Sequence, residues 1–473
     1  MTKGILYASG LGPYGAAWND QPPLHTAILG WWFWACGPSI GVARALGIGF
    51  GCSMLAACWV LVRCRAGTLA AFVAATTLLL SPQVLELGVS VMLEVPAIGT
   101  ALWALWPVLR WQERAGGRLV QGAGRWWLVL SGAILGVALQ IKLTAALVAP
   151  ALAVEILIGT AGPRVFAGPP GQCASQARPA AYLLPRARAA ARSLAAWGGG
   201  LAGSYLLLAL CLGHVPLEVL KASHFSAGTM AHGRDFAFSA LILLDHTEGH
   251  CGGGAALLLI AWRREWRRMA FPLVLLLTAG LVHWQHRPWW AYYYLHFAVP
   301  LAWLSGYAVA TLLDLAWERA PKGLIRPPFA ALGCAAAASL LLALLGGYGG
   351  ERFWCAMQRI RLLPRVATDP LVAKMREYAP GTRWAYARDT IYPFHARVLV
   401  IPELAVLPLK RFWSGQITEE GIWETVRRYR PEQMLLGTEP ISEPFKEFVE
   451  SGYRLVYQDA QRSLYVAKTL VKE

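Results

Sequence analysis

Apolar blocks, each about as long as one helix, alternate with short polar segments through the first three quarters of this 473-residue chain. Uninterrupted apolar stretches of about 20 residues are typical of membrane-spanning helices, because lipid offers no partners for exposed backbone groups. The pattern predicts about ten spans. They lie near 39–64, 67–81, 91–110, 127–141, 143–160, 196–213, 251–263, 269–285, 292–315 and 328–347.

The segment ahead of the first span, residues 1–38, follows a different pattern. It begins polar and rich in glycine, and only residues 24–36 are apolar and aromatic. That stretch is too short to cross a bilayer, and Pro22-Pro23 just before it favours a helix start. We therefore expect 1–38 to be an outer loop that contains a helix lying along the membrane surface.

The last segment, residues 349–473, carries shorter apolar runs and more charge. Strand-like runs occupy 397–401, 433–436, 453–457 and 463–467. Thr418 before Glu419 and Ser442 before Glu443 are typical helix starts. We expect a small soluble α/β domain here, after a transmembrane domain that covers 39–348.

Composition supports a membrane protein, with 56% hydrophobic and only 15% charged residues. Soluble domains carry roughly 25% charged residues. Many of the 22 Trp lie near block ends, where interfacial rings are favoured. The nine Cys are scattered without a CxxC pair, so no zinc motif is visible. The expected fold class is a polytopic α-helical membrane protein with a small C-terminal α/β domain.

The formal net charge of +16 is distributed unevenly among the loops. One set of alternate loops carries eighteen Lys and Arg residues, and the other carries four, namely Lys3, Lys221, Arg234 and Arg287, with Lys142 and the C-terminal tail left out. The positive-inside rule places the first set, with the long 161–195 loop, in the cytoplasm. Both ends of the chain and the 214–250 loop then face outward. Nucleic-acid binding is not favoured, because no basic face interleaves with stacking aromatics.

Three ionisable residues lie near the outer ends of the predicted spans, where a polar side chain is costly unless it is used or paired. Asp20 precedes the surface helix, with Gln21 and His25 close by. Glu94 and Lys142 lie at the outer ends of two different spans. Each has a structural alternative: Asp20 in a solvated turn, and Glu94 and Lys142 reaching water or pairing with each other.

A fourth group follows the 269–285 span and combines basic side chains with aromatic rings. Its members are His283, His286, Arg287, Tyr293 and His296. The aromatic residues alone are typical of a membrane interface, whereas Arg287 with His286 and His296 could hold an anionic head group. Histidines and acids in the 214–250 loop could also bind a divalent metal, but their spacing matches no standard site. The cofactor therefore stays unknown.

These groups place carboxylates and cations on one outer face. A carboxylate can act as general base for an acceptor hydroxyl or amine, and cations can stabilise a departing phosphate. The combination favours group transfer from a lipid phosphate.

The order of these motifs resembles a known family. The Asp20–Leu24 element, the aromatic surface helix and Ala43-Arg44-Ala45-Leu46 are similar to bacterial membrane glycosyltransferases of the GT-C class. The likeness is to the family 39 group of protein mannosyltransferases, aminoarabinose transferases and Rgt-like galacturonosyltransferases. The Met92–Pro96 segment, the Lys142 turn and the stretch from Arg287 to Pro300 follow in the order of that family.

The resemblance implies transfer of a sugar from a polyprenyl-phosphate donor to a lipid, glycan or protein acceptor. The reaction would take place on the periplasmic face of the bacterial inner membrane. Asp20 and Glu94 would be catalytic. Lys142, Arg287, His286, Tyr293, His296, Gln21 and His25 would bind the donor phosphate or substrate.

One difference from the family bears on activity. Its members normally begin with a cytoplasmic N-terminus and a span followed by an acidic residue, whereas this sequence starts within the first outer loop. We expect a gene start placed too late. The alternative is a non-catalytic membrane protein that binds or carries lipid-linked glycans.

Overall fold

The computed structural model describes residues 1–12, 14, 17–115, 124–161, 179–223, 246–286, 289–318, 329–362, 366–438 and 441–471. The chain divides into two compact units. We call Gly47–Cys211 with Gly233–Ile360 the helical unit, and Met1–Leu46, Leu212–His232 and Arg361–Glu473 together the mixed unit. The predicted division at residues 38 and 348 concerns the limits of the membrane, and it stays a prediction.

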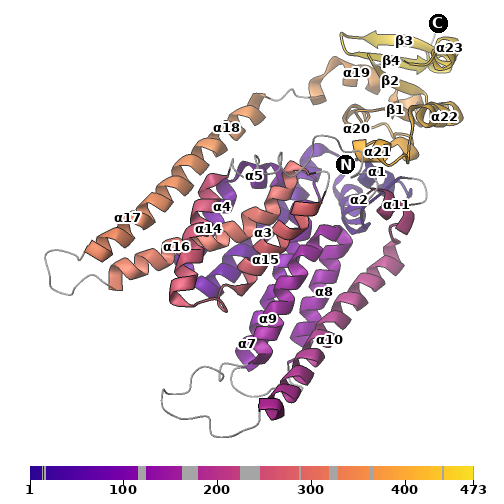
Figure 1. The fold of residues 1–473 in the computed structure, drawn as a ribbon. Coiled ribbons are helices and arrows are strands. Elements are labelled where there is room, and N and C mark those ends of the chain that lie inside the picture. Colours follow the sequence, from indigo (N-terminus) through magenta and orange to yellow (C-terminus); the bar gives the residue numbers. More distant parts are fainter. Residues whose placement is uncertain are drawn as a thin grey trace, which may run out of the picture. The chain divides into compact units, whose positions relative to one another are not determined.

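Helices form at the place of every predicted span (Figure 1). In chain order they are α3 (Ile40–Ala66), α4 (Thr68–Leu80), α5 (Pro82–Gly88), α6 (Glu94–Trp103), α7 (Leu105–Ala115), α8 (Trp126–Ile141), η1 (Leu143–Val148), α9 (Ala149–Ala161), α10 (Pro179–Leu212), α14 (Thr247–Arg263), α15 (Ala270–Gln285), η4 (Ala291–Tyr294), α16 (Leu295–Glu318), α17 (Phe329–Ala343), η5 (Leu344–Tyr348) and α18 (Gly349–Leu362). Several are shorter than a bilayer requires. Among the described residues, five helices are long and apolar enough to cross, or six if the bent pair α4–α5 is one span. The count of about ten is therefore not confirmed.

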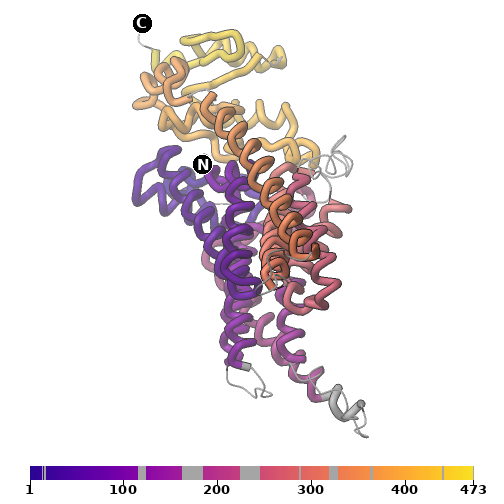
Figure 2. The backbone as a smooth tube through the Cα atoms, turned by 90° about the vertical axis from the view of Figure 1, so that its left-hand side faces the viewer, coloured from indigo at the N-terminus to yellow at the C-terminus, as the bar shows by residue number. Residues whose placement is uncertain are grey.

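Two helical segments extend beyond their predicted limits. The 161–195 segment was expected to be a loop, but α10 already begins at Pro179 and continues to Leu212. Residues 162–178 of that loop lie outside the described residues. The helix of the last predicted span, 328–347, also continues beyond its predicted end. α17, η5 and α18 follow one another without a break from Phe329 to Leu362 (Figure 2, orange).

Helix α16 forms the centre of the helical unit. It packs against α4, α14, α15 and α17, and most of its apolar length is buried. Small residues permit the close approach: a Cβ added at Gly306 would lie 2.2 Å from the carbonyl oxygen of Ala70 in α4. Such contacts between backbones are a common way for helices to associate in lipid, where burial of apolar surface supplies no driving force.

The mixed unit is built around a four-stranded sheet. Its strands are β1 (Ala385–Ala387), β2 (Gln433–Gly437), β3 (Tyr453–Gln458) and β4 (Arg462–Ala467), in the spatial order β1-β2-β4-β3. β1 runs parallel to β2, and the other two pairings are antiparallel. The helical elements of this unit are α1 (Thr2–Ala8), α2 (Leu24–Cys36), α11 (Leu217–Lys221), η6 (Val366–Thr368), α19 (Pro370–Glu377), η7 (Ala379–Gly381), α20 (Ile391–Ala396), η8 (Pro402–Leu404), α21 (Leu409–Trp413), α22 (Glu419–Tyr429), α23 (Glu443–Gly452) and η9 (Lys468–Leu470).

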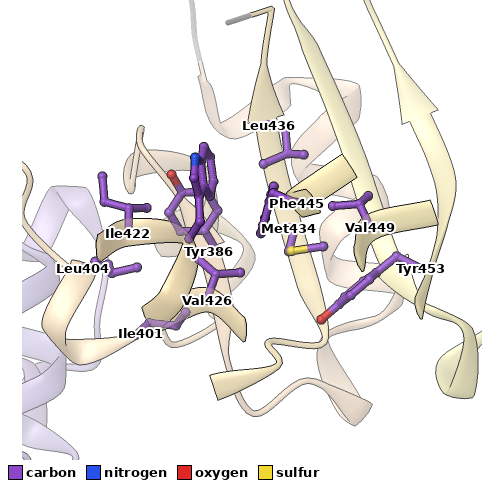
Figure 3. Close-up of a cluster of buried hydrophobic side chains, with 11 residues drawn as sticks. Tyr386, Ile401, Leu404, Ile422, Val426, Met434, Leu436, Phe445, Val449 and Tyr453 are labelled. Carbon is purple, nitrogen blue, oxygen red and sulfur yellow. The ribbon is translucent and has the colours of Figure 1, made fainter. Parts of the chain in front are cut away.

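Both faces of this sheet are covered. Met434 and Leu436 of β2 pack with α22 and α23 in one core, which Figure 3 shows with Phe445 and Val449. Leu435, which lies between them in sequence, packs on the opposite face with residues of α19. This alternation follows from the period of two along a strand, and it makes the C-terminal part a layered α/β domain.

Three of the four predicted strands are confirmed, namely those at 433–436, 453–457 and 463–467. The fourth, at 397–401, is wrong: only an isolated bridge joins Val400 to Ala385 there. Arg397 has φ 61°, because it ends α20 in the left-handed conformation, and Pro402 starts η8. The helix starts at Thr418 and Ser442 are confirmed as the N-caps of α22 and α23.

Candidate functional site

Asp20 lies in the turn before α2, and this turn is inside the mixed unit. Pro23 caps α2, so the Pro-Pro pair starts the helix where the sequence predicted it. Asp20 is 3% exposed, which excludes the solvated turn considered above. Its carboxylate forms an ion pair with Lys410 of α21 and accepts a hydrogen bond of 2.9 Å from Gln21 Nε2.

The surroundings of Asp20 favour its ionised form. Burial opposes ionisation, but Lys410 and Lys3 outweigh it, and together they hold the pKa of the Asp20 carboxyl far below its usual value. His25 is buried on α2, and burial lowers the pKa of its imidazole to about 4. The site therefore combines a charged carboxylate with a neutral imidazole at neutral pH.

Glu94 and Lys142 meet in the helical unit as a buried ion pair. Glu94 is the first residue of α6, where the helix dipole favours a carboxylate. Lys142 lies between α8 and η1, and its extended backbone separates the two helices. Glu94 is 1% and Lys142 6% exposed. The pair is the structural alternative that the sequence left open for both residues, and their role in transfer stays a prediction.

Aromatic rings from η4 complete the surroundings of Lys142. Its Nζ lies 4.7 Å from the ring centroid of Tyr292 and 5.8 Å from that of Tyr293. Cations over aromatic faces are stabilised by the ring quadrupole. In the described part of the chain, Glu94 Oε2 is buried and has no hydrogen-bond partner. The cluster thus holds a carboxylate oxygen whose bonding capacity is not used.

The histidines form two contacts beside this cluster. His286 Nε2 lies 3.1 Å from the Tyr293 hydroxyl, and His283 Nε2 lies 2.8 Å from His296 Nδ1. His296 is 2% exposed and its ring stacks on that of His283. Arg287, which was expected to act with His286 and His296, lies outside the described residues.

Comparison with known proteins shows what this sequence and this fold are similar to. Residues 20–171 match the sequence profile of the dolichyl-phosphate-mannose-protein mannosyltransferase family. The structure resembles the crystal structure of ArnT from Cupriavidus metallidurans in the apo state, with a TM-score of 0.62 over 100% of this chain and 93% of that chain, at 15% identity. No curated protein sequence matches the chain.

Two further solved structures have the same architecture. ArnT from Cupriavidus metallidurans bound to undecaprenyl phosphate matches with a TM-score of 0.59 and 14% identity, over 100% of this chain and 93% of that chain. The oligosaccharyltransferase AglB from Archaeoglobus fulgidus, in complex with an inhibitory peptide and a dolichol-phosphate, matches with a TM-score of 0.53 and 12% identity. The match covers 89% of this chain and 62% of that chain. The chain has the fold of these solved transferases, and residues 20–171 are similar to the mannosyltransferase family.

The candidate residues fall into two groups. Asp20, Gln21 and His25 are together in the mixed unit. Glu94, Lys142, His286, Tyr293 and His296 are in the helical unit. Sequence reasoning missed Lys410, which lies 390 positions from its partner Asp20. No local pattern marks it, since it is one of many basic residues in the C-terminal segment.

In the part of the chain that the structure describes, no site is visible for the metal considered for the 214–250 loop. His224, His232, Asp235 and Asp245 lie outside the described residues. His246 is fully buried, with its ring stacked on Tyr294 and Arg352 hydrogen-bonded to it at 3.0 Å. Among the residues that the structure describes, no group of three or more His, Cys, Asp or Glu could hold a metal ion.

Proposed function

We propose that this chain transfers a sugar from a polyprenyl-phosphate-linked donor to a lipid, glycan or protein acceptor on the periplasmic face of the bacterial inner membrane. One observation carries the proposal. The segment that matches the mannosyltransferase family, 20–171, contains Asp20, Glu94 and Lys142, and all three are buried charged residues. Buried charges are costly in a membrane protein and commonly mark its function.

In the proposed reaction Asp20 is the general base. Its low pKa keeps it ionised, so it can accept a proton from the acceptor as the acceptor attacks the anomeric carbon. The bond from that carbon to the phosphate oxygen breaks, and the lipid phosphate leaves with the electron pair. Lys142, with Arg287, stabilises the charge that develops on the departing phosphate.

The ArnT structure bound to undecaprenyl phosphate supports a lipid phosphate as the donor carrier, because the match covers 100% of this chain and 93% of that chain. Glu94 holds Lys142 in place through the buried ion pair. His286 and Tyr293 lie next to this pair and would contact the donor head group.

The test is transfer of labelled sugar from a purified polyprenyl-phosphate donor by the full-length protein in membranes. Asp20→Asn should lower the rate at least about 100-fold, which is the usual contribution of a general base. Asp389→Asn is the matched control, since Asp389 is an exposed acid of the same unit. A D20N rate equal to that of the control would refute the role of Asp20. Donor binding without any transfer by the wild-type chain would favour the non-catalytic alternative.

A further inference from the structure

Trp18 of the mixed unit is surrounded by three cations. The ring centroid lies 5.2 Å from the guanidinium carbon of Arg411, 5.5 Å from Lys3 Nζ and 5.9 Å from Lys410 Nζ. Each distance is within the range of a cation–π contact. The indole N–H donates to Gln416 Oε1 at 2.7 Å, and Gln416 Nε2 donates to Ser223 Oγ at 3.1 Å. The ring is therefore held in place from two other segments of the chain.

Positive charge exceeds negative charge around this ring. Asp20 is already paired with Lys410, and the nearby Glu403 carboxylate is paired with Arg428 at 2.5 Å. Burial lowers the pKa of Lys3 to about 8. Asp20 acts to raise this pKa, and the repulsion from Lys410 and Arg411 acts to lower it. Crowded cations of this kind are relieved when an anion binds among them.

A cavity of about 220 Å³ opens beside Trp18. Its walls include Tyr14, Trp18, Asn19, Val219, Glu403 and Arg411. Sites for drug-sized ligands are usually about 300–1,000 Å³, so this cavity suits a smaller ligand such as one sugar ring.

Arg411 supplies a buried donor on the cavity wall. It is 8% exposed, and its Nη1 donates to the carbonyl oxygens of Glu403 at 2.7 Å and Val406 at 3.2 Å. Among the described residues, its Nε has no hydrogen-bond partner. The hydrogen bonds that Arg411 makes within the protein therefore leave part of its donor capacity unused, and a guanidinium on a cavity wall favours a carboxylate or phosphate ligand.

We propose that this cavity binds a sugar ring that carries a negatively charged substituent. Trp18 provides a flat apolar surface for the ring, and Arg411 binds the charge from the cavity wall. Lys3, whose Nζ donates to Asn19 Oδ1 at 2.7 Å, adds positive potential from beneath the wall. The cavity belongs to the acceptor side of the reaction, because Asn19 on its wall is adjacent to Asp20 in sequence. This last assignment rests on the proposed function.

Binding is tested on the purified full-length chain by isothermal titration, without a lipid donor. The probes are glucuronic acid, glucose-6-phosphate, glucose and inorganic phosphate. The two charged sugars should bind at least about tenfold more tightly than glucose, which is the effect of about 1.4 kcal/mol. Equal affinity for glucose, or phosphate alone binding as tightly as the sugar phosphate, would overturn the proposal. The better of the two charged sugars identifies the substituent as carboxylate or phosphate.

Val219→Trp places a large side chain on the cavity wall while leaving every charge in place. It should abolish binding of the charged sugars. Leu217→Trp is the matched control, since Leu217 is an exposed residue of the same short helix that does not line the cavity. Arg411→Gln should weaken the charged sugars and leave glucose unchanged. Val219→Trp with wild-type binding would refute the cavity.

These results separate the cavity from the proposed reaction. Selective binding by a chain that never transfers sugar would refute the proposed function and still support the ligand class. Transfer by wild-type chain together with unchanged binding and transfer in Val219→Trp would support the proposed function and refute the cavity.

Discussion

At the residue scale, the ion pair between Asp20 and Lys410 controls the proposed base. Burial alone would raise the pKa of the Asp20 carboxyl, and the neighbouring cations reverse that effect. Lys410→Met removes the cation that is paired with it, so the pKa rises. A single opposite charge within about 4–6 Å changes a carboxyl pKa by about 1–3 units.

We therefore predict that Lys410→Met moves the acid limb of the pH–rate profile upward by at least about one unit. A base with a low pKa is active above that pKa and loses activity as the pH falls through it, so a higher pKa means activity is lost earlier on acidification. Lys446→Met, at an exposed position of the mixed unit, is the control. Coincident profiles for the two variants would contradict the role of Lys410.

Glu94 and Lys142 require a test that separates structure from transfer. Removing one partner of a buried ion pair costs about 3–5 kcal/mol, whereas removing both is often nearly neutral. We predict that Glu94→Gln and Lys142→Met each lower stability and transfer, and that the double variant regains stability but not transfer. Thermal unfolding and the transfer assay measure the two effects. If the double variant transferred sugar at the wild-type rate, the pair would have only a structural role.

At the scale of elements, glycines set the distance between α8 and α10. A Cβ added at Gly200 would lie 2.1 Å from the carbonyl oxygen of Val129, and one at Gly132 would lie 1.9 Å from that of Trp197. No side chain fits such a gap. Gly198, two positions earlier on α10, has no other atom within 4 Å of an added Cβ.

Gly200→Ala should accordingly destabilise the helical unit by about 1–3 kcal/mol, which is the usual cost of overpacking. Gly198→Ala should be neutral or slightly stabilising, because alanine favours the helix. The melting temperature of each purified variant in detergent gives the comparison. Similar melting temperatures for the two would mean that α8 and α10 are not in close contact in the protein.

The sequence revealed those elements whose signal is local. The strands β2, β3 and β4 each have five or six residues and coincide with runs typical of strands, and Thr418 caps α22 through its own side chain, which accepts from Gly421 N. β1 has only three residues, too few for a recognisable strand pattern, and it exists through its pairing with β2. Likewise the pairing of Glu94 with Lys142 could be predicted, because both charges interrupt apolar blocks. The pairing of Asp20 with Lys410 could not, because Lys410 is one of many basic residues in a polar segment.

At the scale of the whole molecule, the direction of insertion decides whether the proposed reaction is periplasmic. The eighteen basic residues in one set of alternate loops favour a cytoplasmic location for that set and a periplasmic one for residues 349–473. Single cysteines introduced into a cysteine-free variant can test this. Arg114 is exposed at the end of α7, and Asp389 is exposed between β1 and α20.

We predict that a membrane-impermeant maleimide labels Asp389→Cys in intact spheroplasts and labels Arg114→Cys only after lysis. The reagent cannot cross the bilayer, so labelling before lysis reports the outer face directly. The cysteine-free parent should stay unlabelled in both conditions, which excludes reaction elsewhere. The reverse pattern would place the α/β domain, and with it Asp20 of the mixed unit, in the cytoplasm. A periplasmic acceptor could then not reach the proposed base, and the acceptor would have to be sought on the cytoplasmic side.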